Sequence, residues 1–210
     1  MRNFKVKMAY NGAMYHGFQR QNNALAVQQV VEEALETLIG EKITINGCSR
    51  TDAGVHARDF CFSFMTDNSI TCNGLVLGLN NLLPDDIAIL SCEEADSDFH
   101  ARFCCKGKEY EYVIHNSRIK NPFYKDTAYR YWYPIDEKML DKAAQDFVGE
   151  HDFKAFCSAD CDKEITVRTI HYFHVRREGD MVYFNVSGDG FLYNMVRIMV
   201  GTLVYINEGK

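Results

Sequence analysis

Apolar and polar residues alternate along this chain with two different periods, and these periods predict its strands and helices. Residues 2–10 alternate apolar side chains with lysines and other polar groups, which is the period of a strand with one buried face. Residues 27–39 instead repeat apolar side chains every three or four positions, which predicts an amphipathic helix. Gly40 is then expected to end that helix.

The rest of the first half continues this pattern. Strands are predicted at 42–47, 58–65 and 86–92, and a second helix at 73–83, just before Pro84. The order strand, helix, strand, strand, helix, strand is the split βαβ pattern of a ferredoxin-like domain. We therefore predict that residues 1–98 form one such half.

The pattern restarts near residue 99, so residues 99–210 are predicted to form a second half. Its predicted elements are strands at 108–114, 128–133, 166–176 and 181–187, a polar loop at 150–164, and two helices. Asp136 is expected to cap the first of these helices, and Gly149 to close it.

The last predicted helix, residues 190–205, is apolar on almost every side and contains Arg197. A buried arginine is costly unless an anion pairs with it, and Asp52 is one candidate partner. Two alternatives stay open from the sequence. The guanidinium can reach the surface along its apolar stem, or it can pair with a structural acid.

Composition limits the classes of function. The formal net charge of −6 argues against a protein that coats nucleic acid through a general positive field. Residues 102–130 are an exception, because this stretch contains seven basic residues and only three acidic ones, with tyrosines between them. This stretch is predicted to be a basic patch, although most of its lysines are also compatible with solvated strand faces.

The chain has eight cysteines, but no pair is spaced Cys-x-x-Cys. A zinc site at His151, Cys157 and Cys161 is the weaker alternative, and we predict no metal and reduced thiols, which indicates the cytoplasm. The first 15 residues do not resemble a signal peptide, and the apolar run at 195–206 is too short to cross a bilayer, so we predict no membrane partner.

The candidate chemistry lies in Ser-Arg-Thr-Asp-Ala-Gly-Val-His-Ala at residues 49–57, between two predicted strands. Gly54 allows a sharp turn, so Asp52 projects from the scaffold. Arg50 lies two positions earlier, on the same side of an extended chain, and a nearby guanidinium keeps a carboxylate ionised. An ordinary surface turn would look similar when this stretch is taken alone.

Several separated stretches resemble the tRNA pseudouridine synthases of the TruA type. Residues 10–21 resemble the family's first loop, with Phe18 where tryptophan is commoner, and residues 47–57 resemble its catalytic motif, with Ser49 where glycine is usual. The other matching stretches are Phe99–Arg102 with Lys108, Tyr110 and Tyr112, Gly149 with 151–153 and Phe156, and Phe191–Leu192 with Met195–Arg197 and Gly201.

The resemblance implies the roles of several residues. Asp52 would be the catalytic aspartate, with Arg50 and Arg197 as the partners that hold it. Tyr110 would lie against the target uracil, and Arg58, His56 and Phe153 would help to bind the substrate. The implied substrate is tRNA, at uridines 38 to 40 of the anticodon stem-loop.

The resemblance also implies an α+β fold. Two ferredoxin-like halves would share one extended antiparallel sheet, with helices packed on one face, the active cleft between the halves, and a homodimer that grips tRNA. The isomerisation of uridine needs no redox change and no group donor, so no cofactor is expected. Family members usually continue past the last motif, so we expect that a C-terminal tail is missing here.

Two other hypotheses compete with this one. A non-catalytic RNA-binding module of RRM-like fold would also expose aromatic residues on a sheet, but it leaves Arg50, Asp52 and Arg197 unexplained. An aspartic protease built on Asp52 would need apolar residues before that aspartate and a second carboxylate opposite it, and the sequence has Arg50 and Thr51 there.

Overall fold

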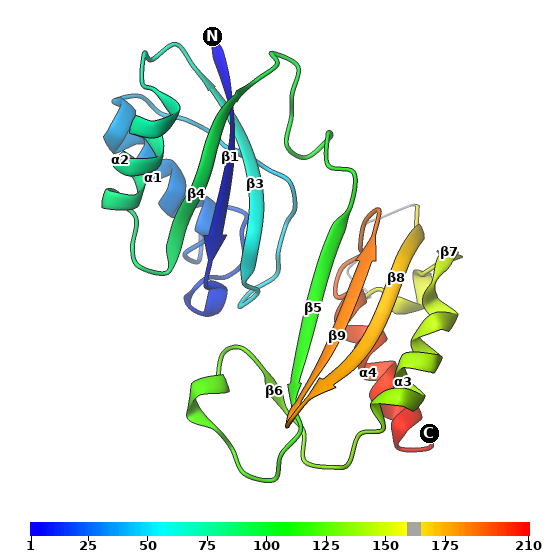
Figure 1. The fold of residues 1–210 in the computed structure, drawn as a ribbon. Helices are drawn as coiled ribbons and strands as arrows, with labels where there is room; N and C mark the ends of the chain where they lie inside the picture. Colours follow the sequence, from blue (N-terminus) through cyan, green and yellow to red (C-terminus); the bar gives the residue numbers. More distant parts are fainter. Residues whose placement is uncertain (159–164) are drawn as a thin grey trace. The chain divides into compact units, whose positions relative to one another are not determined.

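The computed structural model describes residues 1–158 and 165–210. They form a mixed α/β structure of two compact units, residues 1–105 and 106–210 (Figure 1). Each unit has its own sheet and its own hydrophobic core. The single sheet shared by both halves stays a prediction.

The N-terminal unit contains all the elements that its sequence predicts. They are β1 (Arg2–Tyr10), α1 (Val27–Ile39), β2 (Asn46–Gly47), β3 (Ala57–Thr66), α2 (Cys72–Leu82) and β4 (Ile87–Ala95), with a short 3-10 turn at Gly12–Met14. The strands lie in the order β2-β3-β1-β4, and each neighbouring pair is antiparallel. The bounds predicted for β1 and α1 are confirmed, and Gly40 ends α1 in the left-handed conformation at φ 85°.

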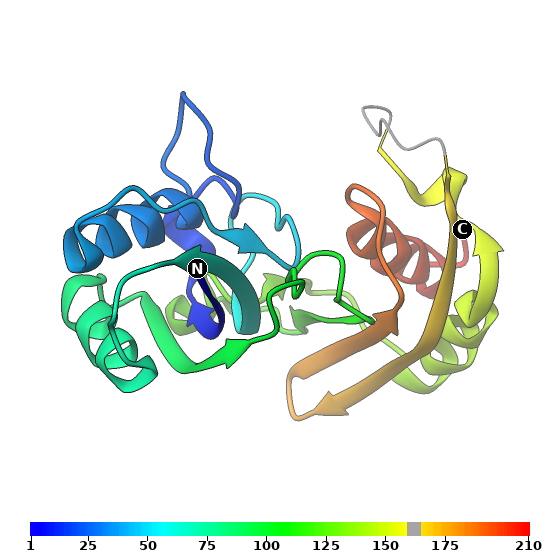
Figure 2. The same ribbon diagram turned by 90° about the horizontal axis from the view of Figure 1, so that it is seen from above.

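Both helices of this unit cover the same face of its sheet (Figure 2). Alternate residues of β1 and β3 are buried there against α1 and α2, while the lysines of β1 are turned away. β2 is shorter than predicted because Ile43 and Ile45 are buried in the core without joining the sheet. Their alternation therefore reflects packing of side chains and not strand pairing.

The C-terminal unit has a five-stranded sheet in the order β6-β5-β9-β8-β7. Its elements are β5 (Lys108–His115), β6 (Tyr129–Arg130), α3 (Glu137–Ala144), β7 (Gly149–Asp152), β8 (Val167–Glu178), β9 (Met181–Gly188) and α4 (Met195–Asn207), with 3-10 turns at Pro122–Tyr124, Gln145–Phe147 and Lys154–Phe156. All strand pairs are antiparallel except β5 with β6.

Three predictions for this unit are wrong. The strand expected at 128–133 shrinks to the two residues of β6, because the Asn116 side chain binds the Tyr131 and Tyr133 carbonyls that a longer strand would need. The loop expected at 150–164 begins with β7, whose charged sequence gives no strand signal. Gly149 begins β7 and does not close α3, which ends earlier at Ala144, although Asp136 caps that helix as predicted.

Arg197 is exposed, which confirms the alternative in which its guanidinium reaches the surface. The buried face of α4 carries Met195, Met199 and Leu203, which repeat every four residues. Arg197 is two residues after Met195, which is more than half a turn around the helix, so its side chain is exposed. Its charge therefore stays in contact with water and needs no buried anion to offset a loss of hydration.

The zinc alternative includes Cys161, which lies outside the described residues. Within 1–158 and 165–210, no three metal-binding side chains are grouped together. None of the seven cysteines described there is part of a disulfide. None of the described helices is both long enough and apolar enough to cross a membrane.

Candidate active site

Asp52 lies half-buried on the loop that joins β2 to β3. The loop turns at Gly54, whose φ of 76° favours glycine. Val55 N–H donates to the Asp52 carbonyl at 3.2 Å, which closes the turn. The sequence prediction of an aspartate on a tight turn between two strands is confirmed.

A second loop, residues 11–18, holds this turn from one side. Phe18 N–H donates to the Thr51 carbonyl at 3.2 Å, and Gly54 N–H donates to the Tyr15 carbonyl at 3.1 Å. These two backbone hydrogen bonds lie on either side of Asp52. The Tyr10 hydroxyl adds a contact of 2.9 Å to the Thr51 hydroxyl.

Two glycines allow the loops to approach so closely. A Cβ atom at Gly17, where φ is 86°, would lie 2.4 Å from the Thr51 carbonyl oxygen. A Cβ at Gly12 would lie 2.0 Å from the Val55 carbonyl oxygen. Both distances are far below a normal van der Waals contact, so only glycine fits at either position. The loop at residues 11–18 and the loop that carries Asp52 are therefore packed together backbone to backbone.

His56 and Arg58 line an open pocket of about 440 Å³ beside this loop, together with Tyr10, Asn11 and Asp86. His56 Nδ1 accepts a hydrogen bond from Gly12 N–H at 3.0 Å. In the neutral imidazole the proton is then on Nε2. Arg58 is exposed at the start of β3, and Arg50 is exposed on the loop itself.

Asp86 is a site residue that the sequence motifs did not identify. Its carboxylate accepts from the Tyr15 hydroxyl at 2.8 Å, and its carbonyl accepts from Asn11 N–H at 2.8 Å. Burial, followed by this hydrogen bond, raises the pKa of Tyr15 above its ordinary range. Tyr15 and Asp86 are 71 positions apart in the chain, so no local signal could have paired them.

The C-terminal unit holds the other predicted residues. Tyr110 lies on β5 opposite Val186 of β9, and its ring meets Phe191 edge to face with ring centres 5.1 Å apart. Burial raises the pKa of Tyr112, and the positive charge of Arg197 acts against that increase. Tyr110 and Tyr112 share one face of β5, and Arg197 is close enough to affect it.

Phe153 is only 2% exposed and belongs to the core of the C-terminal unit. Its ring packs edge to face against His151 and Phe156, with ring centres 5.8 and 6.0 Å apart. This position supports a role in holding the neighbouring loop. A direct contact of Phe153 with substrate stays a prediction.

Comparison with known proteins gives a consistent result. A family model described as tRNA pseudouridine synthase matches residues 7–104 and 143–210. Two similar proteins, from Acetivibrio thermocellus and Clostridium botulinum, are each 44% identical over 210 residues, and a third, from Thermoanaerobacter sp., is 39% identical over 210 residues. All three are named tRNA pseudouridine synthase A.

The alignments with these relatives cover 100% of this chain and 86% of each relative. They therefore include the Asp52 loop, the loop that holds it, and the strand and helix that carry Tyr110 and Arg197. The matches extend over both units of the structure. This chain belongs to the tRNA pseudouridine synthase family.

Proposed function

We propose that this chain isomerises uridine to pseudouridine in tRNA, with Asp52 as the catalytic carboxylate. The observation that carries the proposal is the pair of backbone hydrogen bonds that fix the Asp52 turn against residues 11–18. A nucleophile or base held this way keeps its position when the substrate binds, which lowers the entropic cost of reaching the transition state.

The reaction breaks the bond from N1 to C1′, turns the uracil, and forms a bond from C5 to C1′. C5 loses a proton, N1 gains one, and no electrons are exchanged with another molecule. An ionised carboxylate that acts at the sugar or the base meets this need. Arg50 and Arg197 would keep Asp52 ionised, and the ring of Tyr110 would hold the detached uracil.

The base must leave its stack before Asp52 can act, at a free energy cost of a few kcal/mol. Contacts with the RNA backbone and with aromatic rings offset that cost. Arg58 is exposed and suits a phosphate, and His56 lines the same pocket, where it would help to bind the substrate. Phe153 would help to bind the substrate by supporting the Lys154–Phe156 turn, whose Phe156 ring it contacts.

Finer features complete the proposal. The target uridines would be positions 38 to 40 of the anticodon stem-loop, and the protein would act without metal or cofactor as a cytoplasmic homodimer. Each unit would be a ferredoxin-like half. The order β2-β3-β1-β4, with α1 and α2 as the two crossover helices, supports this for the N-terminal unit.

Release of tritium from tRNA labelled at C5 of its uridines tests the activity. The purified protein should release label, and mapping of pseudouridine by carbodiimide adducts should place it at positions 38 to 40. Pseudouridine at other positions of the tRNA would overturn only the proposed target positions and not the activity. Absence of release from a tRNA that the protein binds would overturn the activity and favour the non-catalytic RNA-binding module.

A further inference from the structure

Residues 116–133 form a long loop between β5 and α3 of the C-terminal unit, broken only by a 3-10 turn and β6 (Figure 1). We call it the 116–133 loop. It carries four cationic side chains, Arg118, Lys120, Lys125 and Arg130, against one carboxylate, Asp126. All four cationic residues are exposed. On a protein with a net charge of −6, this loop is a local positive surface.

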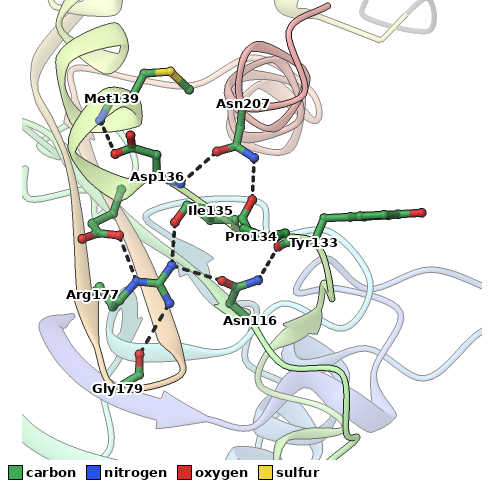
Figure 3. A network of polar contacts seen from close by, with 10 residues as sticks. Asn116, Tyr133, Pro134, Ile135, Asp136, Met139, Arg177, Gly179 and Asn207 are labelled. Carbon is green, nitrogen blue, oxygen red and sulfur yellow. Dashed lines mark hydrogen bonds and ion pairs between the residues drawn. The ribbon is translucent and has the colours of Figure 1, made fainter.

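Polar contacts fix both ends of the 116–133 loop (Figure 3). At its start, the Asn116 amide donates to the Tyr131 and Tyr133 carbonyls at 2.9 and 2.7 Å. Arg177 donates to the Asn116 side-chain oxygen at 3.1 Å and to the Ile135 carbonyl at 2.9 Å. The two ends are therefore joined to each other and to β8.

A cavity of about 440 Å³ opens within this loop and is lined by Lys120, Lys125 and Arg130. His115 and Tyr124 also line it, with their rings edge to face and centres 5.1 Å apart. His115 is only 6% exposed, and a neutral imidazole has one N–H donor. Most of the cavity wall is apolar, and the three cations and one imidazole are the groups on it that suit an anionic part of a ligand.

The 116–133 loop also carries three large aromatic rings that face solvent, and one of them, Tyr129, lines the cavity. Phe123 is 89% exposed, Tyr129 58% and Trp132 52%. The Arg130 guanidinium lies over the Trp132 ring, 5.4 Å from its centre. Cations interleaved with exposed aromatic rings are typical of surfaces that bind unpaired nucleotides, since each base stacks on a ring while its phosphate meets a cation.

We propose that the 116–133 loop binds unpaired RNA, with a backbone phosphate in the cavity and a base stacked on an exposed ring. The proposal rests on the proposed function, because tRNA is then the RNA in question. Lys120 and Lys125 favour RNA over a protein partner, since lysine is depleted at the centres of protein interfaces.

Trp132 allows a direct test, because it is the only tryptophan in the chain. Saturating tRNA should change its emission and protect it from quenching by acrylamide, a neutral quencher. Inorganic phosphate alone should give no protection. Unchanged quenching at a tRNA concentration that saturates a filter-binding assay would overturn the proposal. Protection of Trp132 from acrylamide that increases with protein concentration in the absence of RNA would also overturn the proposal. It would indicate contact between copies of the chain.

Charge variants provide the second arm. The double variant K120Q/K125Q should weaken tRNA binding and lower the slope of log affinity against log salt by about 0.7 for each phosphate that the loop no longer binds. The double variant K138Q/K142Q on α3 removes the same charge from exposed lysines outside the cavity and should leave the slope unchanged. Equal slopes in both double variants would contradict a phosphate in the cavity.

Phe123→Ala should weaken binding about five-fold or more if a base stacks on that ring. These measurements use binding and are separate from the release of tritium. If the protein releases label but Trp132 is unprotected, the loop proposal fails and the activity stands. If Trp132 is protected but no label is released, the loop proposal stands as an RNA contact and the proposed activity fails.

Discussion

The loop that carries Asp52 and the 116–133 loop are held in opposite ways. The first is fixed along its length by backbone hydrogen bonds to residues 11–18, at a separation that only glycine at positions 12 and 17 permits. The second is fixed at its ends through Asn116 and Arg177, while its four cations and the rings of Phe123, Tyr129 and Trp132 are exposed to solvent.

This difference matches two different physical needs. A reacting carboxylate must be placed to within a fraction of an ångström, because a displacement of about 1 Å can cost about 100-fold in rate. A surface that binds RNA through phosphates and stacked bases tolerates movement, since charge attraction and stacking depend weakly on geometry. Variants that loosen each loop should therefore affect different kinetic constants.

Among the variants that test this comparison, the largest effect is expected from Gly17→Ala. The new Cβ would lie 2.4 Å from the Thr51 carbonyl oxygen, so the Asp52 loop must move, and kcat should fall by about 100-fold. Gly40→Ala is the matched control, because Gly40 has nearly the same φ, 85°, with open space around its Cβ position. It should cost about 1 kcal/mol of stability and leave kcat unchanged. Equal losses of kcat in both variants would contradict a specific role of the close contact.

Tyr110→Leu removes a ring that lies on neither loop and should reduce kcat/KM by about ten-fold or more if uracil stacks there. Tyr205→Leu on α4 removes a ring that is 60% exposed and should have little effect. Steady-state kinetics with one tRNA substrate compares them. If both variants behave like the unmodified protein, Tyr110 does not contact the base.

Arg177→Gln should loosen the 116–133 loop and leave the chemistry intact. It removes charged hydrogen bonds to Glu137, Asn116 and the Ile135 carbonyl, so we expect a loss of about 1.5–3 kcal/mol in unfolding free energy and a higher KM with unchanged kcat. Arg176→Gln, on the same strand, removes ion pairs with Glu178 and Glu111 and a cation–π contact with the Tyr183 ring, and should cost about 1 kcal/mol. A larger loss of unfolding free energy in Arg176→Gln than in Arg177→Gln, measured by urea unfolding, would contradict the role of Arg177 in fixing the 116–133 loop.

The smallest effect concerns pH. The hydrogen bond that the Glu137 carboxylate accepts from Arg177, followed by one that it accepts from its own backbone N–H, lowers its pKa below the ordinary value of 4.5. A carboxylate with a lowered folded-state pKa stabilises the fold above its unfolded pKa and loses this contribution as pH falls through the folded pKa. Glu137→Gln should therefore lose less stability on acidification than the unmodified chain, by about 1 kcal/mol or less. The urea midpoint at neutral and acidic pH tests this for the unmodified chain, Glu137→Gln and the control Glu150→Gln. The same decrease in midpoint on acidification in all three proteins would contradict it.

Hydrophobic periodicity was sufficient to predict most of the N-terminal unit. β1 and α1 each bury one continuous stripe of side chains, so their bounds follow from local sequence. β6 and β7 are edge strands of two and four residues, and their existence depends on a partner strand far away in the chain. Arg197 shows a related limit, because an apolar helix with only one covered face still has an exposed side.

The candidate site was predictable as a set of residues but not as a geometry. The motif at residues 49–57 identified Asp52 and its turn. The roles of Gly12 and Gly17 depend on contacts with residues 55 and 51, which are distant in sequence, and Asp86 meets Tyr15 across the unit. Such contacts leave no local pattern, since they arise only when β1, β3 and β4 align in one sheet.

The most direct test of Asp52 as the catalytic residue is the single-turnover rate of tritium release by Asp52→Asn. We predict a loss of at least about 1000-fold with unchanged affinity for tRNA, because the substitution removes the reacting charge and keeps the shape of the loop. Asp59→Asn is the control, since Asp59 is an exposed carboxylate in the same unit that pairs with Lys7 at 2.8 Å. It should release label at the rate of the unmodified protein. Release by Asp52→Asn at that same rate would contradict the assignment of Asp52 as the catalytic residue.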